Sequence, residues 1–230
     1  MNFDIGKATL TEIKPLIEKY HGYKSLGRFC TYALAVIENN TPVAAFVWMP
    51  PPLGPATEIC PNAPYSVLAL SRMVAVPKTE RVLKHISKPL KYQMKYLIDR
   101  TRWPVLITYS DEGQGHTGYT YQCSGWTPTI KSNRKYYLNE ANERTSNYCG
   151  GENGKKPLTY GGITTLQRWE HRACSAGEEK RWLEKHGWEH VVVPGKVWKS
   201  GNQAYRWVKN DSDLHKMFYK KVTYRFLQKR

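Results

Sequence analysis

Apolar positions along the chain recur at two spacings, one typical of helices and the other of strands. Ile13, Leu16, Ile17 and Tyr20 lie three or four residues apart, which predicts a helix over residues 11–21. Apolar and β-branched runs predict strands at residues 32–38, 43–48, 67–76, 105–109, 160–169, 191–193 and 205–208. The first two strands flank a short Asn-Asn-Thr segment and are expected to form a hairpin.

Two later helices are predicted from residues that commonly start helices. Ser87 is an expected N-cap for a helix that runs to about Arg100, and Ser175 with Glu178 predicts a capping box for a helix that ends at His186. Apolar residues are expected on the inner face of the first of these helices, namely Leu90, Met94, Leu97 and Ile98. A loop is expected at 50–65, a short helix or turn at 115–124 and an irregular insertion at 139–156. This order of elements predicts an α/β (α+β) fold with a mixed sheet flanked by helices.

Composition excludes several classes of protein. The 230 residues are 40% hydrophobic and 13% aromatic, which is too much apolar surface for a disordered chain. The longest apolar run, residues 43–49, is far shorter than the ~20 residues that span a bilayer, and the first fifteen residues do not predict a signal peptide. The five cysteines contain no C-x-x-C pair and predict neither a disulfide framework nor a structural zinc site. We therefore expect a folded protein of a reducing compartment that does not enter a membrane.

Positive charge is concentrated in the second half of the chain. The formal net charge is +16, of which 14 basic and 9 acidic residues give +5 up to residue 126, so +11 lies beyond it. After Asp213 the chain carries no acidic residue, and the cations there include Lys216, Lys220, Lys221 and Arg225. Aromatic residues stand between these cations, a composition that suits a nucleic-acid backbone and unstacked bases. The same pattern also fits an amphipathic terminal helix packed on the body, and the two interpretations are compatible.

Chemically active side chains are concentrated between residues 109 and 126. Directly after a predicted buried strand come Tyr109, Asp111, His116, Tyr119 and Tyr121, among four glycines. Open α/β sheets bind ligands at the carboxyl ends of their strands, and glycine allows close approach or unusual backbone angles. A site is favoured here over a purely structural turn in which Asp111 caps the next helix.

A second candidate site lies where the strand ending near residue 76 meets the Ser87 helix. Helix N-termini bind phosphate through free N–H groups. Residues suited to an anion surround this junction, and they are Ser71, Arg72, Lys78, Arg81, Lys84, His85 and Ser87. We expect donor or phosphate binding at this place.

These motifs resemble two related families. The Val74-Ala-Val-Pro77 strand end and the segment Tyr121-Gln-Cys-Ser-Gly125-Trp126 are similar to the GCN5-related acyltransferase core. Leu70-Ser-Arg-Met-Val74, followed by Ser110-Asp111 and by Gly115-His-Thr-Gly118, resembles the Mom family of DNA-modification proteins of Mu-like phages. The resemblance runs from about residue 13 to residue 208 and is weakest at 131–156 and in the basic tail. It implies an acyltransferase-like catalytic core at 1–126 and a basic portion at 127–230 that completes the fold and contacts DNA.

The resemblance implies an enzyme that adds a methylcarbamoyl (acetamido) group to N6 of adenine in duplex DNA, in the host cell cytoplasm, and so protects phage DNA from restriction. An enzyme that acts on a base must take it out of the stack, and Trp48, Tyr119 and Trp126 are candidates to stack on it. The weakly nucleophilic N6 amine needs a base, for which we favour Asp111 or His116. Tyr121 is the expected proton donor, and Tyr109 and Ser124 are further candidates for the catalytic site.

The donor is the least defined part of this interpretation. Related acyltransferases bind coenzyme A with R/Q-x-x-G-x-G/A, whereas residues 77–89 here contain no glycine. The modification also forms an alkyl C–N bond, which plain acyl transfer does not produce. The donor can be acetyl-CoA or another activated two-carbon compound. Iron held by Asp111, His116 and a tyrosine is a further possibility. The alternatives to DNA modification are an N-acyltransferase acting on a protein or small-molecule amine, and a non-catalytic nucleic-acid-binding protein; protein partners are not predicted.

Overall fold

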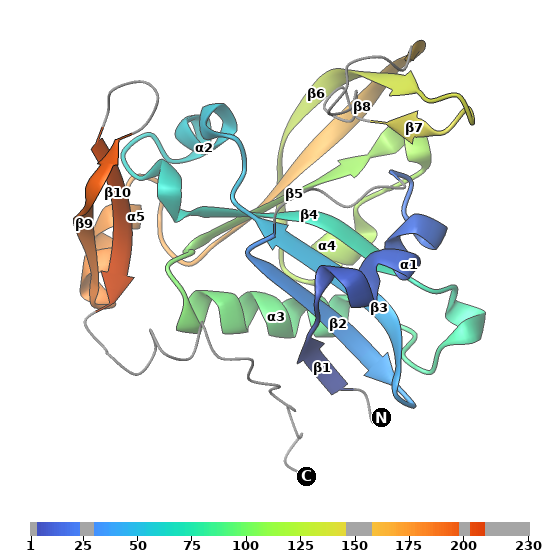
Figure 1. Cartoon of the computed structure of the whole chain (residues 1–230), viewed down its shortest axis with the longest axis horizontal. Helices are drawn as coiled ribbons and strands as arrows, with labels where there is room; N and C mark the ends of the chain where they lie inside the picture. Colours follow the sequence, from blue (N-terminus) through green and yellow to red (C-terminus); the bar gives the residue numbers. More distant parts are fainter. Residues whose placement is uncertain (1–3, 24–29, 146–157, 198–202, 210–230) are drawn as a thin grey trace.

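A computed structural model describes residues 4–23, 30–145, 158–197 and 203–209, with side chains described up to residue 189. Eight strands form one mixed sheet in the order β1-β2-β3-β4-β5-β8-β6-β7, and two more form a separate antiparallel pair (Figure 1). The strands of the large sheet are β1 (Asp4–Lys7), β2 (Tyr32–Glu38), β3 (Thr41–Met49), β4 (Val67–Ala75), β5 (Val105–Asp111), β6 (Thr127–Leu138), β7 (Arg144–Thr145) and β8 (Thr159–Arg172). The small pair is β9 (Trp188–Val197) and β10 (Gln203–Lys209).

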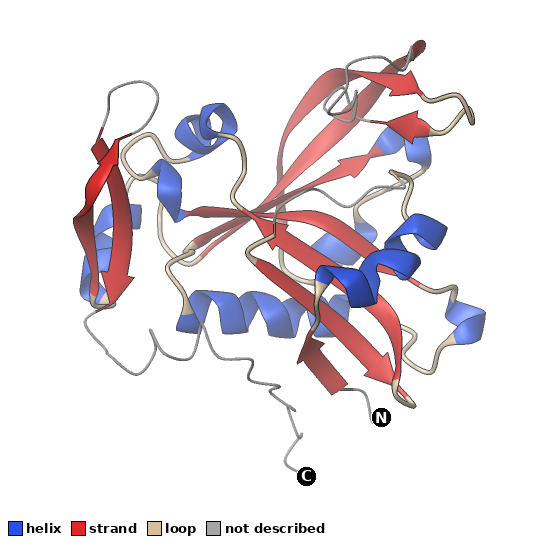
Figure 2. Cartoon of the chain, in the orientation of Figure 1, coloured by secondary structure: helices blue, strands red, loops and turns tan. Residues whose placement is uncertain are grey.

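Helices pack against the sheet, and short 3-10 turns lie in the connections between strands and helices (Figure 2). The helices are α1 (Leu10–Tyr20), α2 (Leu53–Ile59), α3 (Ser87–Arg100), α4 (Tyr119–Cys123) and α5 (Glu179–Lys185), and the 3-10 turns are η1 (Pro64–Ser66), η2 (Lys78–Glu80) and η3 (Glu112–Gln114). This arrangement confirms the predicted mixed α/β fold. In the part of the chain that the structure describes, every helix is too short or too polar to span a bilayer.

The core of the amino-terminal half lies on both faces of β2, β3 and β4. On one face, Ile13 and Ile17 of α1 are fully buried against small side chains such as Ala33 and Ala45. On the other face, Leu90 and Met94 of α3 pack in a larger cluster of apolar and aromatic side chains. Burying side chains of this size is worth about 1.5–3 kcal/mol each, which fixes both helices on the sheet.

The sheet opens between β4 and β5. These two strands run parallel and pair at only three positions, from Val67 opposite Val105 to Ala69 opposite Ile107. Beyond this point β4 stays paired with β3, and β5 stays paired with β8. Ser71 is the extra residue of a bulge in β4, because Leu70 pairs with Trp48 and the next pair joins Arg72 to Val47. A bulge bends its strand, and this one lies where β4 leaves β5.

Residues beyond 126 continue the same sheet. β8 pairs with β5 along seven residues, from Val105 to Asp111, and β6 pairs with the other edge of β8. The outer parts of β6 and β8 extend past the end of β5 and project from the body (Figure 1). The segment predicted as an irregular insertion contributes β7, and residues 146–157 lie outside the described part of the chain.

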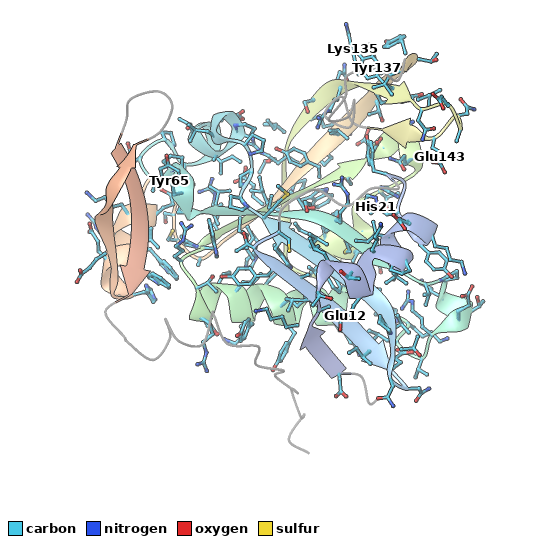
Figure 3. All side chains as sticks on the ribbon, viewed as in Figure 1. Glu12, His21, Tyr65, Lys135, Tyr137 and Glu143 are labelled. Carbon is cyan, nitrogen blue, oxygen red and sulfur yellow. The ribbon has the colours of Figure 1, made fainter. Side chains whose placement is uncertain are left out.

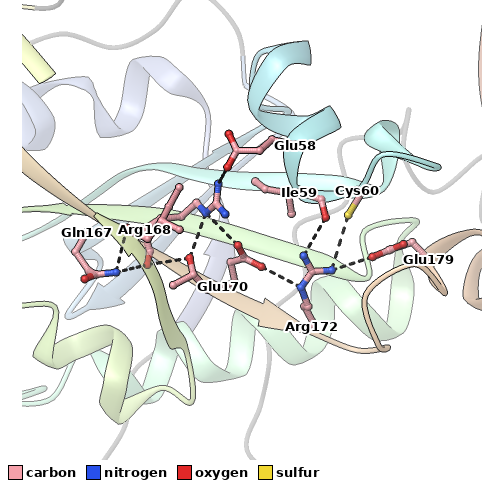
Figure 4. Close-up of polar contacts among 10 residues, drawn as sticks. Glu58, Ile59, Cys60, Gln167, Arg168, Glu170, Arg172 and Glu179 are labelled. Atoms are coloured by element: carbon pink, nitrogen blue, oxygen red, sulfur yellow. Dashed lines mark hydrogen bonds and ion pairs between the residues drawn. The ribbon is translucent and has the colours of Figure 1, made fainter. Parts of the chain in front are cut away.

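A network of arginine–glutamate ion pairs fixes α2 to β8 (Figure 4). The Arg168 guanidinium contacts the carboxylates of Glu58 at 2.8 Å and Glu170 at 3.0 Å. Arg172 contacts Glu170 at 2.9 Å and Glu179 at 2.8 Å, and it donates to the carbonyl oxygen of Ile59 at 3.1 Å. The network therefore joins α2, β8 and α5.

Four expectations about local structure are wrong. A helix, α2, occupies part of the predicted loop at 50–65, and strand β1 was not expected. Ser87 is the first residue of α3 and not its N-cap, which is Ile86 and makes no side-chain capping bond. Glu178 is the N-cap of α5 without a side-chain capping bond; its N–H donates to the Ser175 carbonyl oxygen, so the segment forms a turn and not a capping box.

Candidate functional site

A cavity of about 640 Å³ lies where β4 and β5 diverge. Its walls come from both diverging strands, from residues 50–52 before α2, from the 114–121 segment and from the end of α1. A volume of this size lies within the ~300–1,000 Å³ that is usual for small-molecule sites. The predicted site at the carboxyl end of β5 therefore coincides with a real cavity.

One side of the cavity is formed by the β4 bulge. The Ser71 hydroxyl donates to the carbonyl oxygen of Val47 at 3.0 Å, which holds the bulge in place. The Arg72 guanidinium donates to the Ser71 carbonyl oxygen at 2.7 Å and lies 5.9 Å from the centre of the Tyr23 ring. Both Ser71 and Arg72 line the cavity, so these two predicted anion-binding residues are placed together at it.

Asp111 is a buried carboxylate with three partners. It accepts hydrogen bonds from the Thr164 hydroxyl and from the Gln114 amide at 3.1 Å, and it forms an ion pair with Arg144 at 3.0 Å. The Arg144 guanidinium also lies 3.9 Å from the centre of the Tyr136 ring. Asp111 therefore ties the end of β5 to β7 and β8.

His116 and Tyr121 both line the cavity, but their side chains differ in exposure. The His116 side chain is exposed and lines the cavity, while its backbone N–H donates to the Asp111 carbonyl oxygen at 3.1 Å. Tyr121 is buried, and its ring lies 5.9 Å from both the Trp126 and Trp169 rings. Burial raises the pKa of Tyr121, with a hydrogen bond to Thr108 acting in the opposite direction. The phenol therefore stays protonated at neutral pH.

Three further tyrosines supply aromatic surface to the cavity. Tyr109 and Tyr119 line it and are 39% and 68% exposed, so a ligand can reach both rings. Tyr23, which follows α1, also lines it. Burial raises the pKa of Tyr23 and of Tyr109, and the negative charge of Asp111 contributes for Tyr23.

Three of the predicted site residues lie elsewhere. Trp48 and Trp126 are buried with their rings stacked at 6.4 Å, so neither ring is available to a displaced base. Ser124 is also buried, and its hydroxyl donates to the backbone carbonyl oxygens of Thr120 and Ser87. It joins α4 to α3 and does not line the cavity.

The predicted phosphate site before α3 is occupied by the chain's own groups. The Glu38 carboxylate accepts the backbone N–H groups of Val82 and Leu83 at 2.7 and 2.6 Å. Arg81 is buried and donates to backbone carbonyl oxygens, and so does the Lys84 ammonium, at 2.8 Å. Two N–H groups and two cations of this turn are therefore already bonded within the chain.

The predicted iron ligands do not form a metal site in the structure. Among the described residues, no three His, Cys, Asp or Glu side chains are grouped closely enough to hold a metal ion. Asp111 is instead paired with a guanidinium, which is a poor environment for a cation.

Sequence reasoning missed Tyr23, Arg144 and Thr164, which reach this region from distant segments. The fourteen-residue strand that carries Thr164 could be located from its apolar alternation, but its pairing partner could not. The cations Lys216, Lys220, Lys221 and Arg225, predicted to contact DNA, lie outside the described residues.

Several solved acetyltransferases are similar to this chain. The acetyltransferase of Bacillus subtilis in complex with CoA is 10% identical, with 75% of this chain and 99% of that chain covered and a TM-score of 0.45. The ribosomal-protein-S18-alanine N-acetyltransferase of Escherichia coli is 11% identical, with 77% and 97% covered and a TM-score of 0.43. The IAA acetyltransferase of Bacillus cereus is 11% identical, with 74% and 99% covered and a TM-score of 0.46. Comparison with curated protein sequences gives no match.

The family comparison is more specific. The model of the Mom protein family matches residues 2–209, which is nearly the whole chain. This match agrees with the motifs at residues 70–74 and 110–118. The chain belongs to the Mom protein family.

Proposed function

We propose that this protein is a transferase that adds a methylcarbamoyl group to N6 of adenine in duplex DNA and so shields phage DNA from host restriction. The observation that carries the proposal is the cavity at the divergence of β4 and β5. It combines tyrosine rings on which a base can stack with cations suited to a phosphate backbone. Family membership supports DNA as the substrate.

The side chains of the cavity suit the two proton transfers that this reaction needs. The N6 amine loses a proton as its nitrogen bonds to the donor CH2 group, and the bond from that CH2 to the leaving group breaks. His116 is favoured over Asp111 as the base, because its imidazole is exposed to the cavity whereas Asp111 is held by Arg144. Tyr121, which stays protonated, is suited to donate a proton to the leaving group.

The donor is an activated two-carbon compound with a leaving group on its CH2. Simple acetyl transfer from acetyl-CoA would form an amide and not the alkyl C–N bond of the product. The side-chain bonds that fill the turn before α3 agree with a donor that does not place a pyrophosphate there.

A reconstitution with purified protein tests the proposal. The chain is incubated with an adenine-containing duplex and candidate donors, acetyl-CoA among them, with and without a chelator, and the digested nucleosides are weighed by mass spectrometry. We expect a deoxyadenosine that is heavier by C2H3NO, and a rate about 10²–10⁴-fold lower for His116→Gln. His186→Gln, which changes an exposed imidazole at the C-cap of α5 and outside the cavity lining, is the matched control and should keep the wild-type rate.

Two outcomes contradict the proposal. Thioester turnover in the absence of DNA, with no adenine product, would assign the cavity to acyl transfer onto another amine. Tight DNA binding without any product from a full set of donors would assign the chain to a non-catalytic class.

A further inference from the structure

The outer parts of β6 and β8 form a two-stranded ribbon beside the cavity. In this ribbon, residues 131–138 of β6 pair with residues 159–167 of β8, and from Asn133 onward the pairing runs past the end of β5 (Figure 1). Within the part of the chain that the structure describes, only the last two residues of β6 pair with β7, and the rest of the outer edge of β6 has no strand paired to it. Nearly all of the β6 side chains from Thr127 to Lys135 are exposed. The sequence pattern did not predict this strand.

The ribbon carries positive charge without acidic residues along its strands. Lys131, Arg134 and Lys135 lie within five consecutive residues, about 13 Å of strand at ~3.3 Å per residue. No acidic residue occurs in 127–138 or in 159–167, and Glu140 and Glu143 follow β6 in the turn that leads to β7. Figure 3 shows Glu143 at this turn, apart from Lys135 on the strand.

The cations of the ribbon are available to an external anion. Among the described residues, neither Arg134 nor Lys135 forms an ion pair, and both line the cavity. Lys131 contacts Glu112 at 2.6 Å, but both side chains are more than a third exposed, and such a pair is worth at most about 1 kcal/mol. Side chains alternate along a strand, so Arg134 and Lys135 leave β6 on opposite faces, one on each side of its outer edge.

We propose that the open edge of β6 binds the phosphate backbone of duplex DNA and holds the duplex across the mouth of the cavity. This inference rests on the proposed function and names the surface that delivers the substrate to the site. The partner is a polyanion because Arg134 and Lys135, which form no ion pair among the described residues, line the cavity, and Arg72 lies on another wall of it. The contact is to backbone and not to bases, since the glutamates at the tip disfavour insertion of the tip into a groove.

Charged residues on an edge strand have a second explanation, because lysine there also prevents strands of different molecules from pairing. The two explanations predict different results. If the cations only prevent aggregation, removing them increases light scattering and leaves DNA binding by the remaining monomer unchanged.

The test is the salt dependence of binding to a fluorescent duplex by the full chain. Each phosphate contact contributes ~0.9 to the slope of log K against log salt, so Arg134→Gln with Lys135→Gln should reduce the slope by about 2. The loss should be equal for unrelated duplex sequences. Lys91→Gln with Lys95→Gln removes the same charge from the exposed face of α3 and should leave the slope unchanged.

The outcomes separate this inference from the proposed function. If the wild-type chain modifies adenine but the ribbon variant keeps the wild-type slope, the edge is not the contact and the proposed function stands. A slope reduced only by removal of residues 214–230, or an effect seen only with RNA, would also overturn the inference. If the slope falls as expected but the wild-type chain makes no modified adenine with any donor, the proposed function fails and the ribbon contact stands.

Discussion

The segment that forms the cavity wall depends on a close contact between Gly118 and Trp169. Gly118 has a φ of 75°, in the left-handed region, and a Cβ there would lie 2.0 Å from Cζ2 of the Trp169 ring. The Trp169 ring is buried and donates its Nε1–H to the Ser110 hydroxyl at 2.9 Å. Substitution of Gly118 by alanine must therefore displace a large ring that cannot move freely.

The cost of Gly118→Ala follows from three contributions. A non-glycine residue in the left-handed region costs about 1–2 kcal/mol, and overpacking a buried site costs about 1–3 kcal/mol. Loss of the Trp169–Ser110 hydrogen bond adds about 1 kcal/mol. We expect a total loss of about 3–6 kcal/mol in the free energy of unfolding, measured by urea denaturation.

Gly115→Ala provides the matched control. Gly115 has a φ of 72°, but no atom lies within 4 Å of the position that its Cβ would take. It should therefore show only the backbone cost of about 1–2 kcal/mol. Combining Gly118→Ala with Trp169→Leu should cost less than the sum of the single changes, because the smaller side chain relieves the clash. Equal losses for the two glycine variants, or strict additivity with Trp169→Leu, would refute the packing described here.

Three further predictions concern the interior. Arg168→Met should lower the free energy of unfolding by about 3 kcal/mol, measured by urea denaturation. This is the low end of the cost of breaking a buried ion pair, because Arg172 still contacts Glu170 in the variant. A loss below about 1 kcal/mol would contradict this prediction. Tyr121→Phe should cost about 1 kcal/mol of stability but reduce the rate of adenine modification at least ~10²-fold at saturating DNA, and an unchanged rate would exclude the proton-donor role. Burial raises the pKa of the Cys60 thiol to about 12, so the folded chain keeps a proton that the unfolded chain releases. The free energy of unfolding should therefore fall as the pH rises above about 8.5, and it should fall less steeply in Cys60→Ala. Identical pH profiles for the wild-type chain and Cys60→Ala would contradict the raised pKa of Cys60.

The sequence predicts best those elements whose apolar side chains are buried in the core. The helix with Ile13 and Ile17 and the hairpin of β2 and β3 are found close to their expected bounds. Helix α2 was missed because prolines at 50–52 and 55 are typical of a loop. Pro55 is tolerated because it lies in the first turn, where the missing N–H would have no helical partner.

Strand β6 was missed for the opposite reason. Its side chains are almost all exposed, so no alternation of apolar and polar residues marks it, and its pairing with β8 decides its conformation. The candidate site was predicted from the density of Asp111, His116 and Tyr121 in one segment. The remaining walls of the cavity could not be predicted from the sequence, because the bulge at Ser71 and the approach of Tyr23 result from tertiary packing.

The central claim is that this chain modifies adenine in DNA at the cavity between β4 and β5. Its most direct test is mass spectrometry of nucleosides from the DNA of cells that express the wild-type chain or His116→Gln at equal levels of folded protein. The account predicts a deoxyadenosine heavier by C2H3NO in the wild-type sample and a strong reduction in the variant. Unmodified deoxyadenosine in both samples, with the folded wild-type protein present, would contradict it.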